Sequence, residues 1–234
     1  MSQSIIAHRR AGFLALLTSL AVAVTLAIGL SDTGESSPAG QAPTSHTHAS
    51  NAAGTQARAA FQDQMRKLWE DHVTWTRLAI VTFADGSPGF DATAARLLRN
   101  QDDIGNAIKP FFGDAAGEQL TALLKDHIGI AVELLQAAKA GDHSAFQSAT
   151  AAWYRNANDI ADLLAAANPR YWPQDTMRAA MKEHLDQTLA EASHELTGQY
   201  GASVADYDEI HHHILVMADL LSSGIIRAFP DKLR

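Results

Sequence analysis

A short motif that occurs three times constrains the fold of this chain more than any other feature. An acidic residue, a histidine and an aliphatic residue follow one another at Asp71–Val73, Asp126–Ile128 and Glu183–Leu185. A second polar motif comes 28 residues after the first histidine (72 to 100) and 29 after the others (127 to 156, 184 to 213), as Arg99-Asn100, Arg155-Asn156 and His212-His213. Self-similarity at a fixed period is typical of repeated supersecondary units. We therefore interpret the chain as three tandem helical hairpins.

Apolar residues recur at helical spacing from residue 58 to the C-terminus. The first stripe, for example, runs Phe61, Met65, Leu68, His72 and Trp75 in steps of three and four residues, the spacing of one helix face. Turn-forming Gly, Pro, Asp, Asn or Ser residues interrupt the stripes at 84–89, 113–114, 141–144, 168–173 and 198–201. No stretch alternates apolar and polar residues over the length of a strand. The sequence thus predicts an all-α fold, a six-helix bundle over residues 58–234.

Residues 1–30 predict a membrane anchor or a signal helix. Residues 11–30 carry no charge, Arg9 and Arg10 precede them, and Asp32 follows. Twenty apolar residues are enough to span a bilayer. A cleaved signal peptide has a shorter apolar region and a small-x-small cleavage site, for which residues 27–29 are a weak match. We expect an uncleaved single-pass anchor in the cell membrane with the domain outside the cytoplasm, or a secreted or periplasmic protein if cleavage occurs.

Residues 31–57 consist mainly of Ser, Thr, Gly, Ala and Pro and show no periodicity. Segments of this composition bury too little apolar surface to fold by themselves. We expect a flexible linker between the anchor and the bundle.

Composition excludes several classes of function. The net charge of -8 and the absence of concentrated Lys and Arg argue against a nucleic-acid partner. The chain has no cysteine, which rules out thiolate metal sites, Fe–S clusters and a cysteine nucleophile. It also lacks a Gly-x-Ser-x-Gly element, a phosphate-binding glycine loop and a dinucleotide fingerprint. These absences favour a binding protein over an enzyme.

Polar residues lie on the predicted buried stripes at equivalent positions of the three hairpins. A buried imidazole or amide without a partner costs about 1–3 kcal/mol. The residues that need partners are His72, His127, Asn100 and Asn156 on the stripes and His184 and His213 at their edges.

One hypothesis is that the histidines converge in the bundle interior. Imidazoles bind Zn, Fe, Mn or Cu ions, and bundle cores host such sites on facing helices. The ligands of a metal ion or of a small molecule would then be His72, His127, His184 and His213. The residues expected to support them from around the site are Asp71, Asp126, Glu183, Asn100 and Asn156. A carboxylate one residue before a histidine points about 100 degrees away on a helix, so we expect support from neighbouring helices.

The alternative hypothesis is that each hairpin satisfies its own histidine. The pairs would be His72–Asn100, His127–Asn156 and His184–His213, three copies of one clamp within a structural or partner-binding module of the cell envelope.

Outside the bundle stripes, Tyr171 and Trp172 lie in a proline-bounded connection and are candidates for contact with a ligand or with the bilayer interface.

Three segments carry a resemblance to a family of proteins. They are residues 68–77 (LWEDHVTWTR), 97–113 (LLRNQDDIGNAIKPFFG) and 213–226 (HILVMADLLSSGII). Over residues 60–230 the chain resembles a family of small, exported, all-helical bacterial proteins that are often labelled glycosyltransferases. The resemblance implies a transferase as a further alternative. Nucleotide-sugar transferases have α/β domains or large multi-span membrane bodies, and this sequence predicts neither.

The clamp hypothesis makes a prediction that separates it from metal binding. His72→Ala and His127→Ala should lower the melting temperature by similar amounts, with or without a chelator, because each removes one local contact. Near-stoichiometric metal in purified residues 58–234, lost in His127→Ala and His184→Ala, would contradict it. Elemental analysis of protein expressed without a His-tag measures this.

Overall fold

Six helices joined by short turns make up residues 45–234, the part of the chain described by this computed structural model. They are α1 (Ser45–Ala84), α2 (Phe90–Phe112), α3 (Asp114–Ala140), α4 (His143–Ala167), α5 (Gln174–Leu196) and α6 (Tyr200–Ala228). No strand occurs within residues 45–234, so the predicted all-α fold is confirmed for them. The expected anchor (1–30) and the expected linker as far as residue 44 lie outside the described residues.

The predicted breaks between the helices match the observed turns, and their chemistry explains why. At the α3–α4 turn, Gly141 ends α3 with a left-handed φ of 68°, a conformation that only glycine adopts without strain. Asp142 then caps α4, because its carboxylate accepts hydrogen bonds from the backbone N–H groups of Ser144 (3.1 Å) and Ala145 (3.0 Å).

Helix α1 begins well before Arg58, where the apolar stripe predicts its start. Residues 45–57 have no apolar stripe, but four of them are alanine, the residue with the highest helix propensity, and none is proline. The far end of the chain also packs here, since a Cβ at Gly54 would lie 3.5 Å from the Cα of Arg234. Thirteen residues of the expected linker are therefore helical (45 to 57).

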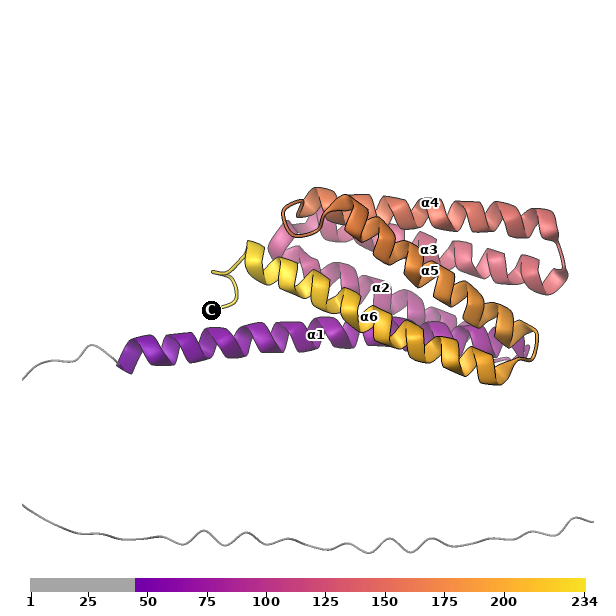
Figure 1. Cartoon of the computed structure of the whole chain (residues 1–234), viewed down its shortest axis with the longest axis horizontal. Helices are drawn as coiled ribbons and strands as arrows, with labels where there is room; N and C mark the ends of the chain where they lie inside the picture. The colour runs from indigo at the N-terminus through magenta and orange to yellow at the C-terminus, as the bar shows by residue number, and fades with distance from the viewer. Residues whose placement is uncertain (1–44) are drawn as a thin grey trace, which may run out of the picture. The chain divides into compact units, whose positions relative to one another are not determined.

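Each helix packs against the next one in the chain, and α6 packs back against α1, so the bundle closes on itself (Figure 1). Polar contacts join α1 to α6 along this seam. Arg66 and Asp219 form a bidentate ion pair with N···O distances of 2.6 and 2.5 Å, and Glu70 accepts from Nε2 of His211 at 2.8 Å.

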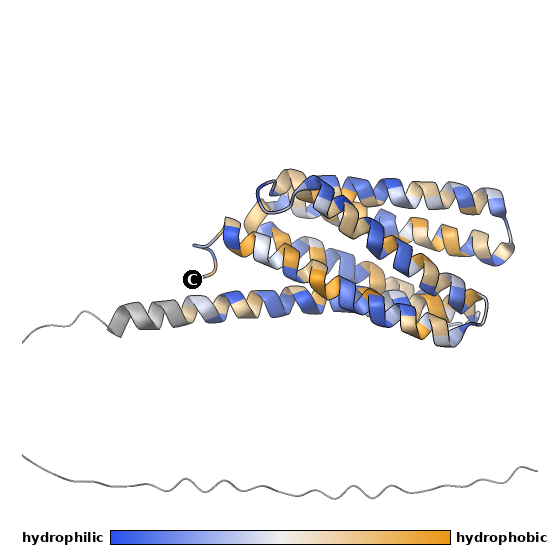
Figure 2. Ribbon diagram, viewed as in Figure 1, coloured by the Kyte–Doolittle hydropathy of each residue, from blue (hydrophilic) through white to orange (hydrophobic). Residues whose placement is uncertain are grey.

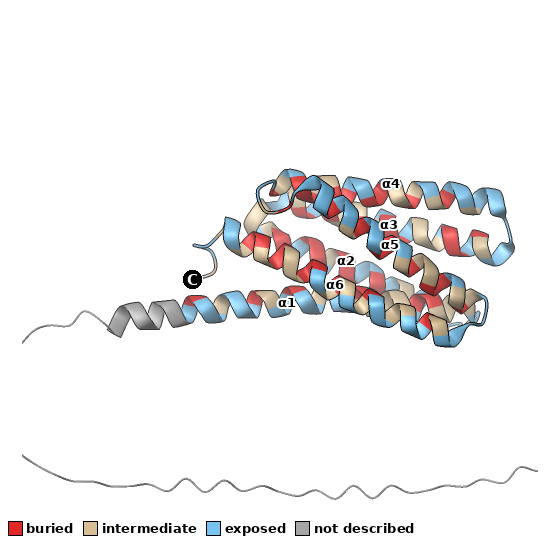
Figure 3. Cartoon of the chain, in the orientation of Figure 1, coloured by how far each residue is buried: buried red, intermediate tan, exposed pale blue. Residues whose placement is uncertain are grey.

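The buried residues of α1, α3 and α5 recur at matching positions of the three hairpins. Seven residues before each repeated histidine lie Met65, Leu120 and Met177, and three before it lie Trp69, Leu124 and Met181, all buried. Eight residues after it lie Ile80, Leu135 and Ala192, which contact one another in one cluster. In Figures 2 and 3 the apolar and buried positions run as stripes along the inward faces of the helices. The repeat in the sequence is thus also a repeat in packing.

Trp172 is a core residue, not a surface contact. It is 0% exposed, and its indole Nε1 donates to the carbonyl oxygen of Leu220 at 3.3 Å. The ring fills the space beside Gly224, where a Cβ would lie 2.9 Å from two of its carbon atoms. The expectation that Trp172 contacts a ligand or the bilayer is therefore wrong.

Within residues 45–234, no helix combines the length and the apolar character needed to cross a bilayer.

The close approach of α2 and α3 depends on two facing glycines. A Cβ at Gly105 would lie 2.6 Å from the carbonyl oxygen of Gly117, and a Cβ at Gly117 would lie equally close to the carbonyl oxygen of Gly105. We expect Gly105→Ala to lower the free energy of unfolding by about 1–3 kcal/mol, because the helices must move apart.

Gly129 provides the matched control in α3, since nothing lies within 4 Å of an added Cβ there. Gly129→Ala should raise the free energy of unfolding by up to about 1 kcal/mol through helix propensity. Urea denaturation measures both changes, and equal effects of the two substitutions would contradict this account of the contact.

A candidate ligand site between the repeated histidines

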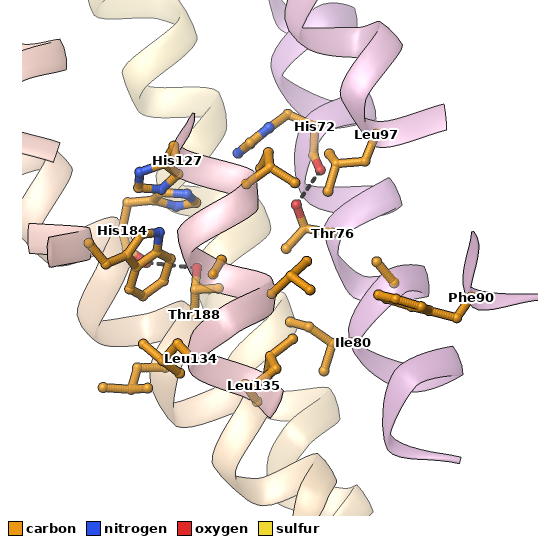
Figure 4. Close-up of a pocket in the computed structure, with 17 residues that line it drawn as sticks. His72, Thr76, Ile80, Phe90, Leu97, His127, Leu134, Leu135, His184 and Thr188 are labelled. Atoms are coloured by element: carbon orange, nitrogen blue, oxygen red, sulfur yellow. Dashed lines mark hydrogen bonds between the residues drawn. The ribbon is translucent and has the colours of Figure 1, made fainter. Parts of the chain in front are cut away.

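A small cavity lies in the bundle interior where the three repeated histidines come together. Its volume is about 50 Å³, and its lining includes His72 of α1, His127 of α3 and His184 of α5. Figure 4 shows the three imidazoles gathered at one end, with the His72 ring directed towards the other two. The rings of His72 and His184 have centroids 5.7 Å apart. The structure therefore brings three of the four predicted histidines to one place.

The two ends of the cavity differ in polarity. The imidazoles form one end, and Thr76 and Thr188 follow them one helical turn on, each donating to the carbonyl oxygen of the histidine four residues earlier at 2.8 Å. Aliphatic and aromatic side chains line the other end, among them Ile80, Phe90, Leu134 and Leu135 (Figure 4). A molecule bound here would meet polar groups at one end only.

The tautomer of His127 follows from its hydrogen bonds. Its Nδ1 lies 2.7 Å from Oδ1 of Asn156. The Asn156 oxygen can only accept, so Nδ1 carries the proton and Nε2 is a bare acceptor. That Nε2 is buried and has no hydrogen-bond partner. The ring also stacks on Trp153, with centroids 5.1 Å apart and planes 27° apart.

His72 has the opposite tautomer. The amide nitrogen of Gln101 lies 3.3 Å from Nδ1 of His72 and also donates to the carbonyl oxygen of Leu97 at 2.8 Å. Since this nitrogen is a donor, Nδ1 of His72 accepts and Nε2 carries the proton. His184 adds a third ring whose Nδ1 is buried without a partner. The cavity therefore presents an N–H donor from His72 and a bare acceptor from His127.

All three imidazoles are held neutral. They are 2–4% exposed, and burial disfavours the charged form. Burial lowers the pKa of His72 to about 3, with a smaller contribution from His127. It lowers the pKa of His127 to about 4, which the hydrogen bond to Asn156 partly opposes. The pKa of His184 is lowered by burial first and then by the neighbouring histidines.

The three hairpins share one hydrogen bond that the sequence did not predict. The side-chain nitrogen of Asn100 donates to the carbonyl oxygen of Leu68 at 3.0 Å. The matching bonds join Asn156 to Leu123 (3.1 Å) and His213 to Ala180 (3.0 Å). Each acceptor lies four residues before the repeated histidine, and a carbonyl has a second lone pair for this bond. Asparagine and histidine are interchangeable here because each supplies one N–H.

Only one of the three expected clamps pairs the residues directly. His127 binds Asn156, as the clamp hypothesis predicts. His72 instead contacts Gln101, and no direct bond joins His184 to His213 among the described side chains.

His213 and the three carboxylates lie away from the cavity. His213 does not line it and sits between α5 and α6, with its Nδ1 3.7 Å from Glu183. Asp71 pairs with Lys67 and Arg96 at 3.2 and 3.5 Å. Asp126 and Glu183 are exposed. In the described part of the chain, no three His, Asp or Glu side chains are grouped so that they could hold one metal ion.

Sequence reasoning missed Gln101, which is 0% exposed and contacts His72. The repeat itself contains the signal. The equivalent positions, one residue after Asn156 and His213, are Ala157 and Ile214, both buried and apolar. A glutamine at a position where the other hairpins carry core residues indicates a buried polar group.

A second buried polar group joins α1, α5 and α6. Arg77 donates to Oε1 of Glu191 at 2.8 Å and lies 3.4 Å from Oε2 of Glu195. Both carboxylates are buried, at 1% and 6% exposed, and Ser203 donates to Glu195 at 2.6 Å. Burial raises the pKa of Glu191 to about 7, against the opposing effect of Arg77. One guanidinium therefore serves two carboxyl groups.

Comparison of the chain with protein-family models, with curated proteins and with solved structures gives no match.

The buried histidines predict that the protein loses stability in acid. Unfolded histidine titrates near pH 6.5, whereas His72 and His127 stay neutral in the fold down to pH 3–4. Between these limits the unfolded state binds more protons, so stability falls as the pH falls. Glu191 has the opposite sign, because its folded pKa of about 7 lies above its ordinary 4.5.

When the protein unfolds near pH 5.5, His72, His127 and His184 together take up about three protons, and Glu191 releases one. We expect the free energy of unfolding to fall by about 3 kcal/mol per pH unit there. Glu191→Gln removes the opposing group, so the slope should steepen to about 4 kcal/mol per unit. Urea denaturation between pH 7 and 5 measures both, and a stability independent of pH would contradict the neutral, buried imidazoles.

Proposed function

We propose that this protein is a membrane-anchored, extracytoplasmic helical domain that binds a small ligand through the inward-facing His72, His127 and His184. The observation that carries the proposal is the pair of unpartnered ring nitrogens, Nε2 of His127 and Nδ1 of His184, at the cavity. Each unpartnered buried polar atom costs about 1–3 kcal/mol. A bound molecule that pairs with these atoms would recover that cost.

An uncharged molecule fits the site better than a metal ion. A divalent ion in the interior needs several imidazole or carboxylate groups close enough to bind it together, and no three His, Asp or Glu side chains within residues 45–234 are grouped in that way. The residues that would complete such a set, His213, Asp71, Asp126 and Glu183, lie outside the cavity. Neutral imidazoles surrounded by aliphatic side chains are suited to a neutral group that donates and accepts hydrogen bonds.

The three tandem hairpins and the N-terminal anchor belong to the same proposal. The matching bonds to Leu68, Leu123 and Ala180 support the hairpin as the repeated unit. They also favour a second candidate, a structural or partner-binding module of the envelope in which the repeated polar residues hold the helices together. In that case the cavity would contain water only.

Substitution of Ala131 separates the two candidates, because Ala131 lines the cavity on α3. We expect 1-hexanol, at ten times its dissociation constant, to stabilise the wild-type protein by about 1.4 kcal/mol. The ¹⁵N resonance of His127 Nε2 should shift at the same time. Ala131→Leu fills the cavity and should abolish both effects.

The exposed Ala122 lies on the same helix and gives the matched control. Ala122→Leu should bind 1-hexanol as the wild type does. Binding that survives Ala131→Leu, or no binding by the wild type, would favour the structural module. Parallel titrations with Zn²⁺, Mn²⁺, Fe²⁺ and Cu²⁺ should leave the His127 resonance and the melting temperature unchanged.

A further inference from the structure

We propose that the ligand of this cavity is a neutral amphiphile, an apolar chain with a terminal hydroxyl group that binds between the histidines. This inference rests on the proposed function and adds the chemical class of the ligand. It follows from the hydrogen-bonding polarity of the imidazoles, from the absence of a counter-charge among the described residues that line the cavity, and from a groove that adjoins the cavity.

The hydrogen bonds at the polar end require one group that both donates and accepts. His127 offers a bare Nε2, which needs a donor, because its proton is on the Nδ1 that binds Asn156. His72 offers an Nε2–H, which needs an acceptor, because its Nδ1 accepts from Gln101. A hydroxyl has one proton to donate and two lone pairs to accept with. An ether or a ketone could satisfy only His72.

The head group should be uncharged. A carboxylate or an ammonium group would lose its hydration in the cavity, at a high cost unless an opposite charge pairs with it. Among the described residues, no Asp, Glu, Lys or Arg lines the cavity. The imidazoles supply no charge either, since burial keeps the pKa of His72 and His127 at about 3 and about 4.

The rest of the ligand has a place at the end of the bundle. The cavity of about 50 Å³ holds little more than the head group. A groove of about 520 Å³ adjoins it, formed by the ends of α1, α3 and α5 and the start of α4. That volume is in the usual range of ligand pockets. The two share Leu134, Leu135, Leu189 and Ala192, so a chain could run from the groove to the histidines along apolar walls.

Among the described residues, the one cation on the lining of the groove is already engaged. Lys139 donates to the carbonyl oxygens of Phe83 (2.8 Å) and Ala84 (3.0 Å) at the C-terminus of α1. Its ammonium also lies 5.0 Å from the centre of the Phe83 ring. The groove therefore offers no free positive charge to a fatty acid, which leaves a neutral chain as the better fit.

Three probes of equal size test the head group on the full-length protein at neutral pH. They are 1-octanol, its isomer 1-methoxyheptane, which lacks the O–H donor, and octanoate, which is charged. We expect 1-octanol to bind at least about tenfold more tightly than either of the others. The ¹⁵N shift of His127 Nε2 should report a hydrogen bond only with 1-octanol.

His127→Asn is the informative variant, because an asparagine amide can still donate to Asn156 but lacks the distal ring nitrogen. It should reduce the affinity for 1-octanol about tenfold and leave that for 1-methoxyheptane unchanged. Ala192→Leu narrows the passage between groove and cavity and should lower the affinity for 1-octanol. Ala140→Leu, at the exposed end of α3, is the control and should leave this affinity unchanged.

Equal binding of 1-octanol and 1-methoxyheptane would overturn the hydroxyl head group and leave ligand binding intact. Tighter binding of octanoate than of 1-octanol would also overturn the hydroxyl head group, and it would favour a fatty acid as the ligand. Binding of none of the three, together with failure of 1-hexanol to bind, would overturn both this inference and the proposed function. If His127→Asn does not fold, the affinities of the three probes for the wild-type protein are enough to decide whether the head group is a hydroxyl.

Discussion

Removal of three imidazole rings from water at one level of the bundle is the constraint on which the rest of this structure depends. Each ring has to stay neutral, and each then presents one N–H and one bare nitrogen that need partners. Asn156 and Gln101 satisfy one nitrogen each on His127 and His72. The layers above and below, such as Trp69, Leu124 and Met181 or Ile80, Leu135 and Ala192, enclose the rings in apolar side chains. The nitrogens that remain without partners, Nε2 of His127 and Nδ1 of His184, are the groups to which the proposed ligand would bind.

The fold was more predictable from the sequence than the site. Helical periodicity and turn residues gave the number of helices and their boundaries, because both depend on local chain properties such as the glycine and aspartate at 141 and 142. Periodicity also placed His72 and His127 inside, and it placed His184 at the edge of a stripe. It could not tell which atom each ring binds, because a one-residue difference decides between Asn100 and Gln101 as the partner of His72. His213 was misplaced for a related reason: a residue at the edge of a stripe can face the core or the neighbouring helix. Periodicity does not predict the extension of α1 to Ser45, because residues 45–57 have a high helix propensity but no apolar stripe.

Comparison of equivalent positions shows which features the repeats share and which they vary. The bond to the carbonyl four residues before each histidine occurs in every hairpin, with asparagine or histidine as donor. The lining of the cavity varies, with Thr76 and Thr188 where the second hairpin has Ala131. Glu191 likewise replaces the buried Ala79 and Leu134 of the other hairpins. The scaffold is thus repeated, whereas the polar groups beyond the histidines differ from one hairpin to another.

The seam between α1 and α6 determines when the chain can complete its fold. The contact of Arg66 with Asp219 joins residues 153 positions apart, and that of Thr74 with Tyr207 joins residues 133 apart. Contacts of such separation are slow to form, because the loop entropy is lost before the contact stabilises anything. Each hairpin can assemble from neighbouring residues as it emerges, but the two buried carboxyl groups beside Arg77 gain their partner only when α5 and α6 reach α1. We therefore expect the contacts of α5 and α6 with α1 to form last during folding. Until then, the histidine layer would remain accessible to water and to the proposed ligand.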